Sequence, residues 1–177
     1  RYKDMWDWTF LSSNPPMPWS ETLIERHKDQ WDWRYLSIDP SLPWSDALIE
    51  RFQDKWNWLY LSENPSLPWS EALIERYQDK WNWGKTEIDL GLSEKSFWDA
   101  EFGHDVTSID DYALHEISHN GLSGNAGLPW SGDLINRFKN QWQWMILSNN
   151  PSLPWSDTLI DQFAEYWDWT VDGYSIE

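Results

Sequence analysis

A 25-residue repeat organises most of this 177-residue chain. The pair Trp-x-Trp and a second signature, Pro-Trp-Ser, both recur at this step, and together they contain 17 of the 18 tryptophans. The pairs begin at Trp6, Trp31, Trp56, Trp81, Trp142 and Trp167, and the second signature contains Trp19, Trp44, Trp69, Trp130 and Trp155. A repeat of this length predicts a stack of similar units, because one unit alone cannot bury its own apolar face.

Each unit contains two predicted helix starts, as residues 56–80 illustrate. Asn57, between the paired tryptophans, is a preferred N-cap, so a short helix should begin there and end before Pro65. Ser70 is a second N-cap, and the apolar residues after it have helical spacing. These apolar residues are Leu73, Ile74, Tyr77 and Trp81. The spacing predicts an amphipathic helix of about 11 residues in every unit.

The repeat lapses between the units that contain Trp81 and Trp142. The sequence from Leu122 to Ser131 matches the repeat again, and in that register Ile117–Ser118–His119 occupies the Trp-x-Trp position. We interpret this unit as a degenerate repeat with about 11 extra residues. The chain then divides into Trp-rich repeats with a truncated first unit (1–83), a degenerate repeat with an acidic insertion (84–128), further Trp-rich repeats (129–169) and a tail (170–177).

The predicted fold is therefore all-α, a solenoid-like stack of 25-residue helical hairpins with one irregular insertion. Asp172–Gly173 lies between short β-prone pairs, which predicts a short C-terminal β-hairpin. Residues 1–8 match the second half of a unit, as in residues 76–83, so we expect the chain to be a piece of a longer array.

Charge and hydropathy exclude several classes of partner. The chain has 30 acidic and 13 basic residues, for a net charge of −17, which argues against binding a nucleic-acid backbone. A mean hydropathy of −0.75 and the absence of a long apolar run argue against a membrane span. Most of the negative charge lies in residues 84–128 and 157–177, where a solvated surface and a cation or basic-partner site both remain open. Nothing in the sequence predicts a cellular location.

The motif W-[DN]-W-x-x-L-S-x-N-P-S-L-P-W-S-x-x-L-I-E-R resembles tryptophan-rich tandem repeats of uncharacterised proteins from bacteria and large DNA viruses. The resemblance covers roughly 130 of the 177 residues and leaves out the interruption. It implies tandem helical units, with neither known catalytic residues nor an established ligand.

One short motif suggests metal chemistry. His115–Glu116–Ile117–Ser118–His119 reads H-E-x-x-H, in which two histidines one turn apart bind zinc and the glutamate acts as general base. Catalytic Glu116, with metal ligands His104, His115 and His119, would make the chain a zinc-dependent hydrolase. The same three histidines could also form a non-catalytic metal site. Two observations oppose the hydrolase alternative: no histidine follows His119, and the repeat register places a helix start at Ser118.

The residues after each Trp-x-Trp pair vary between units and are candidate contacts with a partner. Phe10, Tyr35, Tyr60 and Ile146 could form a ridge that binds another protein, or they could equally be contacts between adjacent units. The tryptophans could stack on sugars in a glycan-binding module, although their fixed spacing with Leu and Ile favours a core. We predict a non-catalytic structural or protein-interaction segment, without cofactor or metal, whose partners are other proteins or further copies of the repeat.

Overall fold

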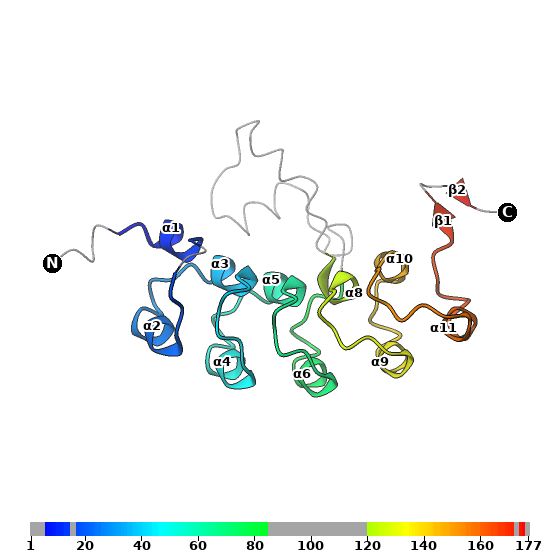
Figure 1. The fold of residues 1–177 in the computed structure, drawn as a ribbon, viewed down its shortest axis with the longest axis horizontal. Helices are drawn as coiled ribbons and strands as arrows, with labels where there is room; N and C mark the ends of the chain where they lie inside the picture. The colour runs from blue at the N-terminus through cyan, green and yellow to red at the C-terminus, as the bar shows by residue number, and fades with distance from the viewer. Residues whose placement is uncertain (1–5, 15–16, 85–119, 172–173, 176–177) are drawn as a thin grey trace.

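The computed structural model describes residues 6–14, 17–84, 120–171 and 174–175. Short helices stand in two rows, and the chain alternates between the rows (Figure 1). The first row contains α1 (Trp8–Ser12), α3 (Trp33–Ile38), α5 (Trp58–Glu63), α8 (Gly121–Gly124) and α10 (Trp144–Ser148). The second row contains α2 (Glu21–Arg26), α4 (Asp46–Arg51), α6 (Glu71–Arg76), α9 (Gly132–Arg137) and α11 (Asp157–Gln162). The predicted all-α, solenoid-like arrangement is confirmed.

The helices begin where the predicted N-caps stand. The hydroxyl of Ser70 accepts a hydrogen bond from the Leu73 amide at 3.1 Å, and serines cap the other helices of the second row in the same way. In the first row the side chain of Asn57 accepts from the amides of Leu59 and Tyr60. Each cap satisfies amides that the first helical turn would leave without partners.

The helices of the second row are shorter than the predicted 11 residues, and the reason is the tryptophan that follows each of them. α6 ends at Arg76, because the carbonyl of Ile74 accepts a hydrogen bond from the indole Nε1 of Trp81 at 3.1 Å. In a continued helix that carbonyl would accept from the amide four residues later. The same bond recurs in the other units. In each, the indole Nε1 of the first tryptophan of a pair donates to the carbonyl of the isoleucine seven residues earlier.

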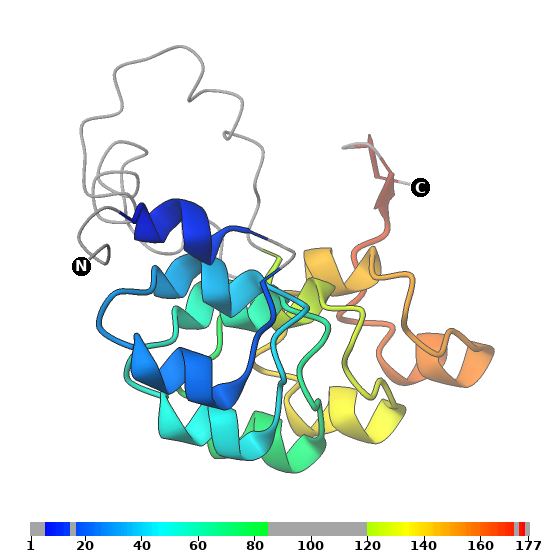
Figure 2. The ribbon, with the colours of Figure 1, turned by 60° about the vertical axis from the view of Figure 1, so that its left-hand side comes forward.

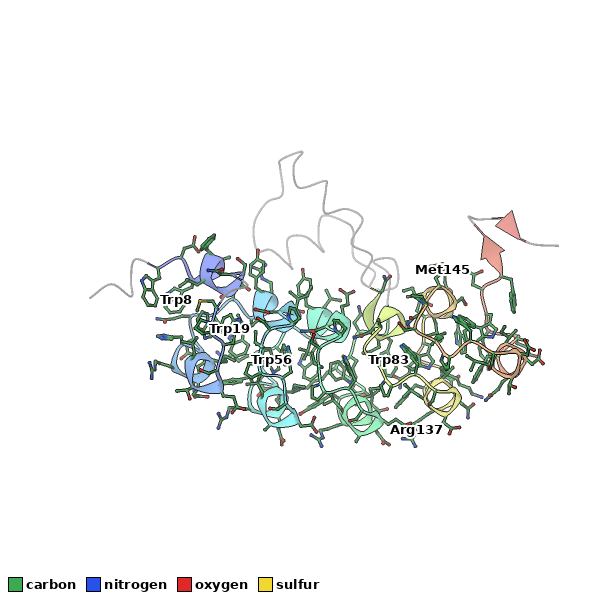
Figure 3. All side chains as sticks on the ribbon, in the orientation of Figure 1. Trp8, Trp19, Trp56, Trp83, Arg137 and Met145 are labelled. Atoms are coloured by element: carbon green, nitrogen blue, oxygen red, sulfur yellow. The ribbon has the colours of Figure 1, made fainter. Side chains whose placement is uncertain are left out.

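The space between the rows contains an aromatic cluster in each unit. Trp56 points into this space (Figure 3), where its ring centroid lies 4.7 Å from that of Trp33 and 4.9 Å from that of Trp44. The Trp33 contact is nearly perpendicular, at 78°, which is the edge-to-face arrangement that aromatic quadrupoles prefer. His27 occupies the position of Phe52 in such a cluster: it is buried, and its ring centroid lies 5.0 Å from that of Trp8.

Neighbouring units are joined by a buried polar ladder. The hydroxyl of Ser62 donates to the carbonyl of Trp58 at 2.6 Å and accepts from the amide of Asn82, in the next unit, at 2.8 Å. The side-chain amide of Asn64 donates to the carbonyl of Ser37, in the preceding unit, at 3.0 Å. Both side chains are 0% exposed, so these bonds hold the units in register without competition from water.

The structure corrects the interpretation of the interrupted unit. Trp83, and not His119, takes the tryptophan position there: its ring lies 4.8 Å from that of Trp142, and it points between the rows like Trp56 (Figure 3). The hydroxyl of Ser123 donates to the carbonyl of Trp83 at 2.5 Å, across a separation of 40 residues in place of the usual four. One unit therefore contains a 36-residue insertion, residues 85–120, in the middle of its first-row helix.

A glycine stands at each side of this insertion, Gly84 before it and Gly121 after it. Gly84 has a φ of 101° and Gly121 a φ of 53°, in the left-handed region that favours glycine. A Cβ atom on Gly121 would lie 2.3 Å from the carbonyl oxygen of Asn82 and 2.5 Å from the amide nitrogen of Gly84. The two chain segments pass so closely that neither glycine has room for a side chain.

The last described elements follow α11. β1 (Thr170–Val171) pairs antiparallel with β2 (Tyr174–Ser175), with Thr170 opposite Ser175, where a further first-row helix would otherwise begin. Among the described helices, none has the length and apolar character that crossing a membrane requires.

Candidate interaction surface

The four predicted partner-binding residues share one repeat position, the second after the paired tryptophans, and lie in α1, α3, α5 and α10. Phe10 is 67% exposed and Tyr35 is 41% exposed, whereas Tyr60 and Ile146 are half-buried. Met145, beside Ile146, is 52% exposed and points away from the second row (Figure 3). We call the line of Phe10, Tyr35, Tyr60, Met145 and Ile146 the first-row ridge.

Ile146 differs from the others because it lies against the insertion joint. Its Cδ1 atom would be 2.9 Å from a Cβ atom on Gly84, so the glycine leaves space for this side chain. The sequence left open whether these residues contact a partner or the adjacent unit, and the ridge contains residues of both kinds. Phe10 faces solvent, and Ile146 also contacts the neighbouring unit.

The indole N–H groups of the repeat are engaged inside the stack. Trp58 Nε1 donates to the carbonyl of Gln53 at 3.0 Å, and Trp69 Nε1 donates to the carbonyl of Asn64 at 2.9 Å. The most exposed tryptophans described are near the two ends of the stack: Trp6 at 49%, Trp155 at 42% and Trp169 at 52%. The indoles of the central units thus pack inside the stack and donate hydrogen bonds to backbone carbonyls there.

One charged pair lies beside the ridge. Arg34 forms an ion pair with Asp32, the N-cap of α3, at 2.8 Å. Burial of Asp32 opposes its ionisation, but the hydrogen bond and positive charge of Arg34 outweigh burial and hold the pKa of Asp32 below its ordinary value. The carboxylate therefore stays charged at neutral pH and caps the helix that carries Tyr35.

The outer side of the second row presents ion pairs between successive units. Arg51 lies 3.8 Å from Glu21, Arg76 lies 3.9 Å from Asp46, and Arg137 lies 3.3 Å from Glu71. In each pair an arginine at the end of one helix meets an acid in the first turn of the helix before it. All are exposed, so each contributes about 1 kcal/mol or less to stability. The pattern gives the units of α2, α4 and α6 an acid on the side that faces the following unit, and it stops at α11, where Gln162 takes the place of the arginine.

The residues of the predicted zinc site, Glu116 with His104, His115 and His119, lie outside the described residues. Within the described segments, no three His, Asp or Glu side chains gather closely enough to hold a metal ion. The zinc-dependent alternative therefore stays a prediction.

The sequence analysis missed the serine and asparagine of the polar ladder. The serines are Ser12, Ser37, Ser62, Ser123 and Ser148, and the asparagines are Asn64, Asn125 and Asn150. Their signal was present, because the serine recurs directly after the buried leucine of each first-row helix and the asparagine recurs two residues after the serine. A polar residue at a buried position must find a hydrogen-bond partner, and here the serines find one in the next unit and the asparagines in the preceding unit.

Comparisons of the chain with protein-family models, with curated proteins and with solved structures found no match.

Proposed function

We propose that this chain is a non-catalytic, protein-binding segment built from tryptophan-rich 25-residue repeats, and that the first-row ridge is its contact surface. The observation that carries the proposal is the contrast along each unit. The tryptophans, serines and asparagines that recur are occupied inside the stack, whereas the residues that vary reach solvent from the first row.

The chemistry of the ridge supports a protein partner. Phe10, Tyr35 and Met145 are large, apolar or amphipathic and more than 40% exposed, and such residues dominate the energetics of protein interfaces. Equivalent positions of stacked units follow one another along the row, so the ridge offers an elongated surface that fits an extended or helical segment of another protein.

Site-specific photo-crosslinking tests this proposal. A benzophenone side chain replaces Phe10 or Tyr35, and the protein is irradiated in extract from its source cells. We expect one and the same partner to be captured from both positions and identified by mass spectrometry. The matched control carries the benzophenone at Asp54, an exposed residue beyond the second row.

The ridge should be dispensable for folding. Phe10→Ser combined with Met145→Ser is expected to abolish capture by a benzophenone at Tyr35, with the melting temperature changed by less than about 2 °C. Equal capture at Asp54 and at the ridge, or capture unaffected by the double substitution, would refute the assignment.

A further inference from the structure

Each unit of the stack has a side that the preceding unit covers and a side that the following unit covers. In the second-row helices Leu48, Leu73 and Leu134 are at most 1% exposed, but Leu23 in the first unit is half-buried. The neighbouring isoleucines behave in the opposite way: Ile24 is 0% exposed, and Ile160 in the last unit is half-buried. The leucine position thus faces the preceding unit, and the isoleucine position faces the following one.

The first unit has an uncovered apolar side. Leu11, Met17 and Leu23 are half-buried there, whereas their equivalents in the other units are at most 5% exposed. Trp6 is 49% exposed, whereas its equivalents are at most 6% exposed. These residues line a hollow of about 610 Å³ at the outer side of α1 and α2. Figure 2, in which this end comes forward, shows no described helix in front of it.

The hollow also has a charge that matches the repeat. Arg26 lines it, at the position of Arg51, Arg76 and Arg137. Each of those three arginines meets an acid in the first turn of the preceding second-row helix, and no such helix precedes Arg26 among the described residues. The matching occupant therefore brings an acidic residue to the start of its helix and an isoleucine three residues later.

We propose that the hollow formed by Trp6, Leu11, Met17, Leu23 and Arg26 is a docking surface for one further unit of this same repeat. The unit would cover the three apolar side chains with its isoleucine side and pair its first-turn acid with Arg26. This inference goes beyond the proposed function, because it concerns the end of the stack. Phe10, at the start of the first-row ridge, also borders the hollow, whereas Tyr35, Tyr60, Met145 and Ile146 do not line it.

The C-terminal end of the stack does not offer a surface that is complementary to this hollow. Trp169 and β1 already occupy the place where the next first-row helix would begin, and the chain continues as the β1–β2 pair. A second copy of the chain would meet these residues, so the fitting occupant is a complete unit and not the C-terminal end of another copy.

The test extends the chain by one unit in register. A copy of residues 56–80 replaces residues 1–5, directly before Trp6. Because the chain has no cysteine, Met17→Cys introduces a single thiol whose rate of labelling by a maleimide reports how far the hollow is covered. Leu42→Cys, at the equivalent covered position, is the matched buried control.

In the unextended chain we expect Met17→Cys to react at least about tenfold faster than Leu42→Cys, since access at the buried site requires local opening. Extension should bring the two rates within about threefold of each other. An appended copy with Ile74→Asp should leave Met17→Cys reactive, and Arg26→Glu should lower the melting temperature only of the extended protein.

Two results would overturn the proposal. One is rapid labelling of Met17→Cys in the extended protein together with proteolytic removal of the appended unit, which would show that the hollow rejects a unit. The other is slow labelling in the unextended protein together with a dimer in sedimentation, which would make a second copy the occupant. These readouts are the labelling of Met17→Cys and the oligomeric state, whereas crosslinking from Tyr35, which does not line the hollow, tests the ridge, so the two proposals can fail separately.

Discussion

Removing the hydroxyl group of Ser62 is the most direct test of the polar ladder. Ser62→Ala deletes one oxygen from a side chain that is 0% exposed and leaves almost no cavity. The change removes the donation to the carbonyl of Trp58 and leaves the amide of Asn82 without its acceptor. A lost hydrogen bond costs about 1 kcal/mol, and an unsatisfied buried donor costs about 1–3 kcal/mol.

We therefore expect Ser62→Ala to lower the free energy of unfolding by about 2–3 kcal/mol. With a urea dependence of about 2 kcal/mol per molar, the midpoint should fall by roughly 1 M. Urea unfolding followed by tryptophan fluorescence measures the midpoint, and hydrogen exchange measures protection of the Asn82 amide. Ser66→Ala, an exposed serine of the same unit, is the control and should change stability by less than about 0.5 kcal/mol.

The result that would refute the ladder is a Ser62→Ala protein indistinguishable from Ser66→Ala, with the Asn82 amide still protected. Water or a shifted backbone would then satisfy that amide, and the serine would not hold the two units in register.

Three further predictions concern other parts of the chain. The lowered pKa of Asp32 means that its pair with Arg34 stabilises the fold above the ordinary carboxyl pKa of about 3.9, and that this stabilisation is lost as the pH falls through the folded pKa. The urea midpoints of Arg34→Ala and wild type should therefore differ at pH 7 and approach each other as the pH falls below that ordinary carboxyl pKa. Gly121→Ala places a Cβ atom 2.3 Å from a backbone oxygen at positive φ and should cost about 3 kcal/mol or more, visible as a fall of several degrees in the melting temperature. A non-catalytic role predicts that elemental analysis of purified protein finds no zinc that depends on His115 and His119; stoichiometric zinc abolished by His115→Ala with His119→Ala would favour the hydrolase alternative.

Local signals predicted much of the fold. The 25-residue period and the capping serines depend on residues close in sequence, so helix starts such as those after Asn57 and Ser70 were correctly predicted. The length of α6 was not, because it depends on the indole of Trp81 returning to the carbonyl of Ile74. A helical pattern of apolar residues does not reveal that a later side chain takes over a backbone acceptor.

The predicted position of the insertion was wrong for a related reason. Counting back from Trp130 assigns the Trp-x-Trp position to Ile117–Ser118–His119, because a linear alignment requires one continuous unit. The structure shows a discontinuous unit instead, in which Trp83 and Ser123 meet across 40 residues. The only local sign was a glycine at each side of the joint, Gly84 and Gly121, and glycines alone do not reveal a close approach between distant segments. Variation between units, in contrast, indicated the first-row positions from sequence. Phe10, Tyr35 and Met145 are exposed there and Tyr60 and Ile146 are half-buried, and their binding of a partner stays a prediction.

The account depends most directly on the continuity of the stack across the insertion. Deleting residues 85–120, with Gly84→Leu and Gly121→Tyr, restores the Trp-Leu-Tyr-Leu-Ser sequence of α5 at the joint. The account predicts one cooperative thermal transition at an equal or higher temperature, since bringing together two segments that are separated by 36 residues of sequence costs closure entropy. Two separate transitions, with the repeats before and after the deletion unfolding independently, would contradict it.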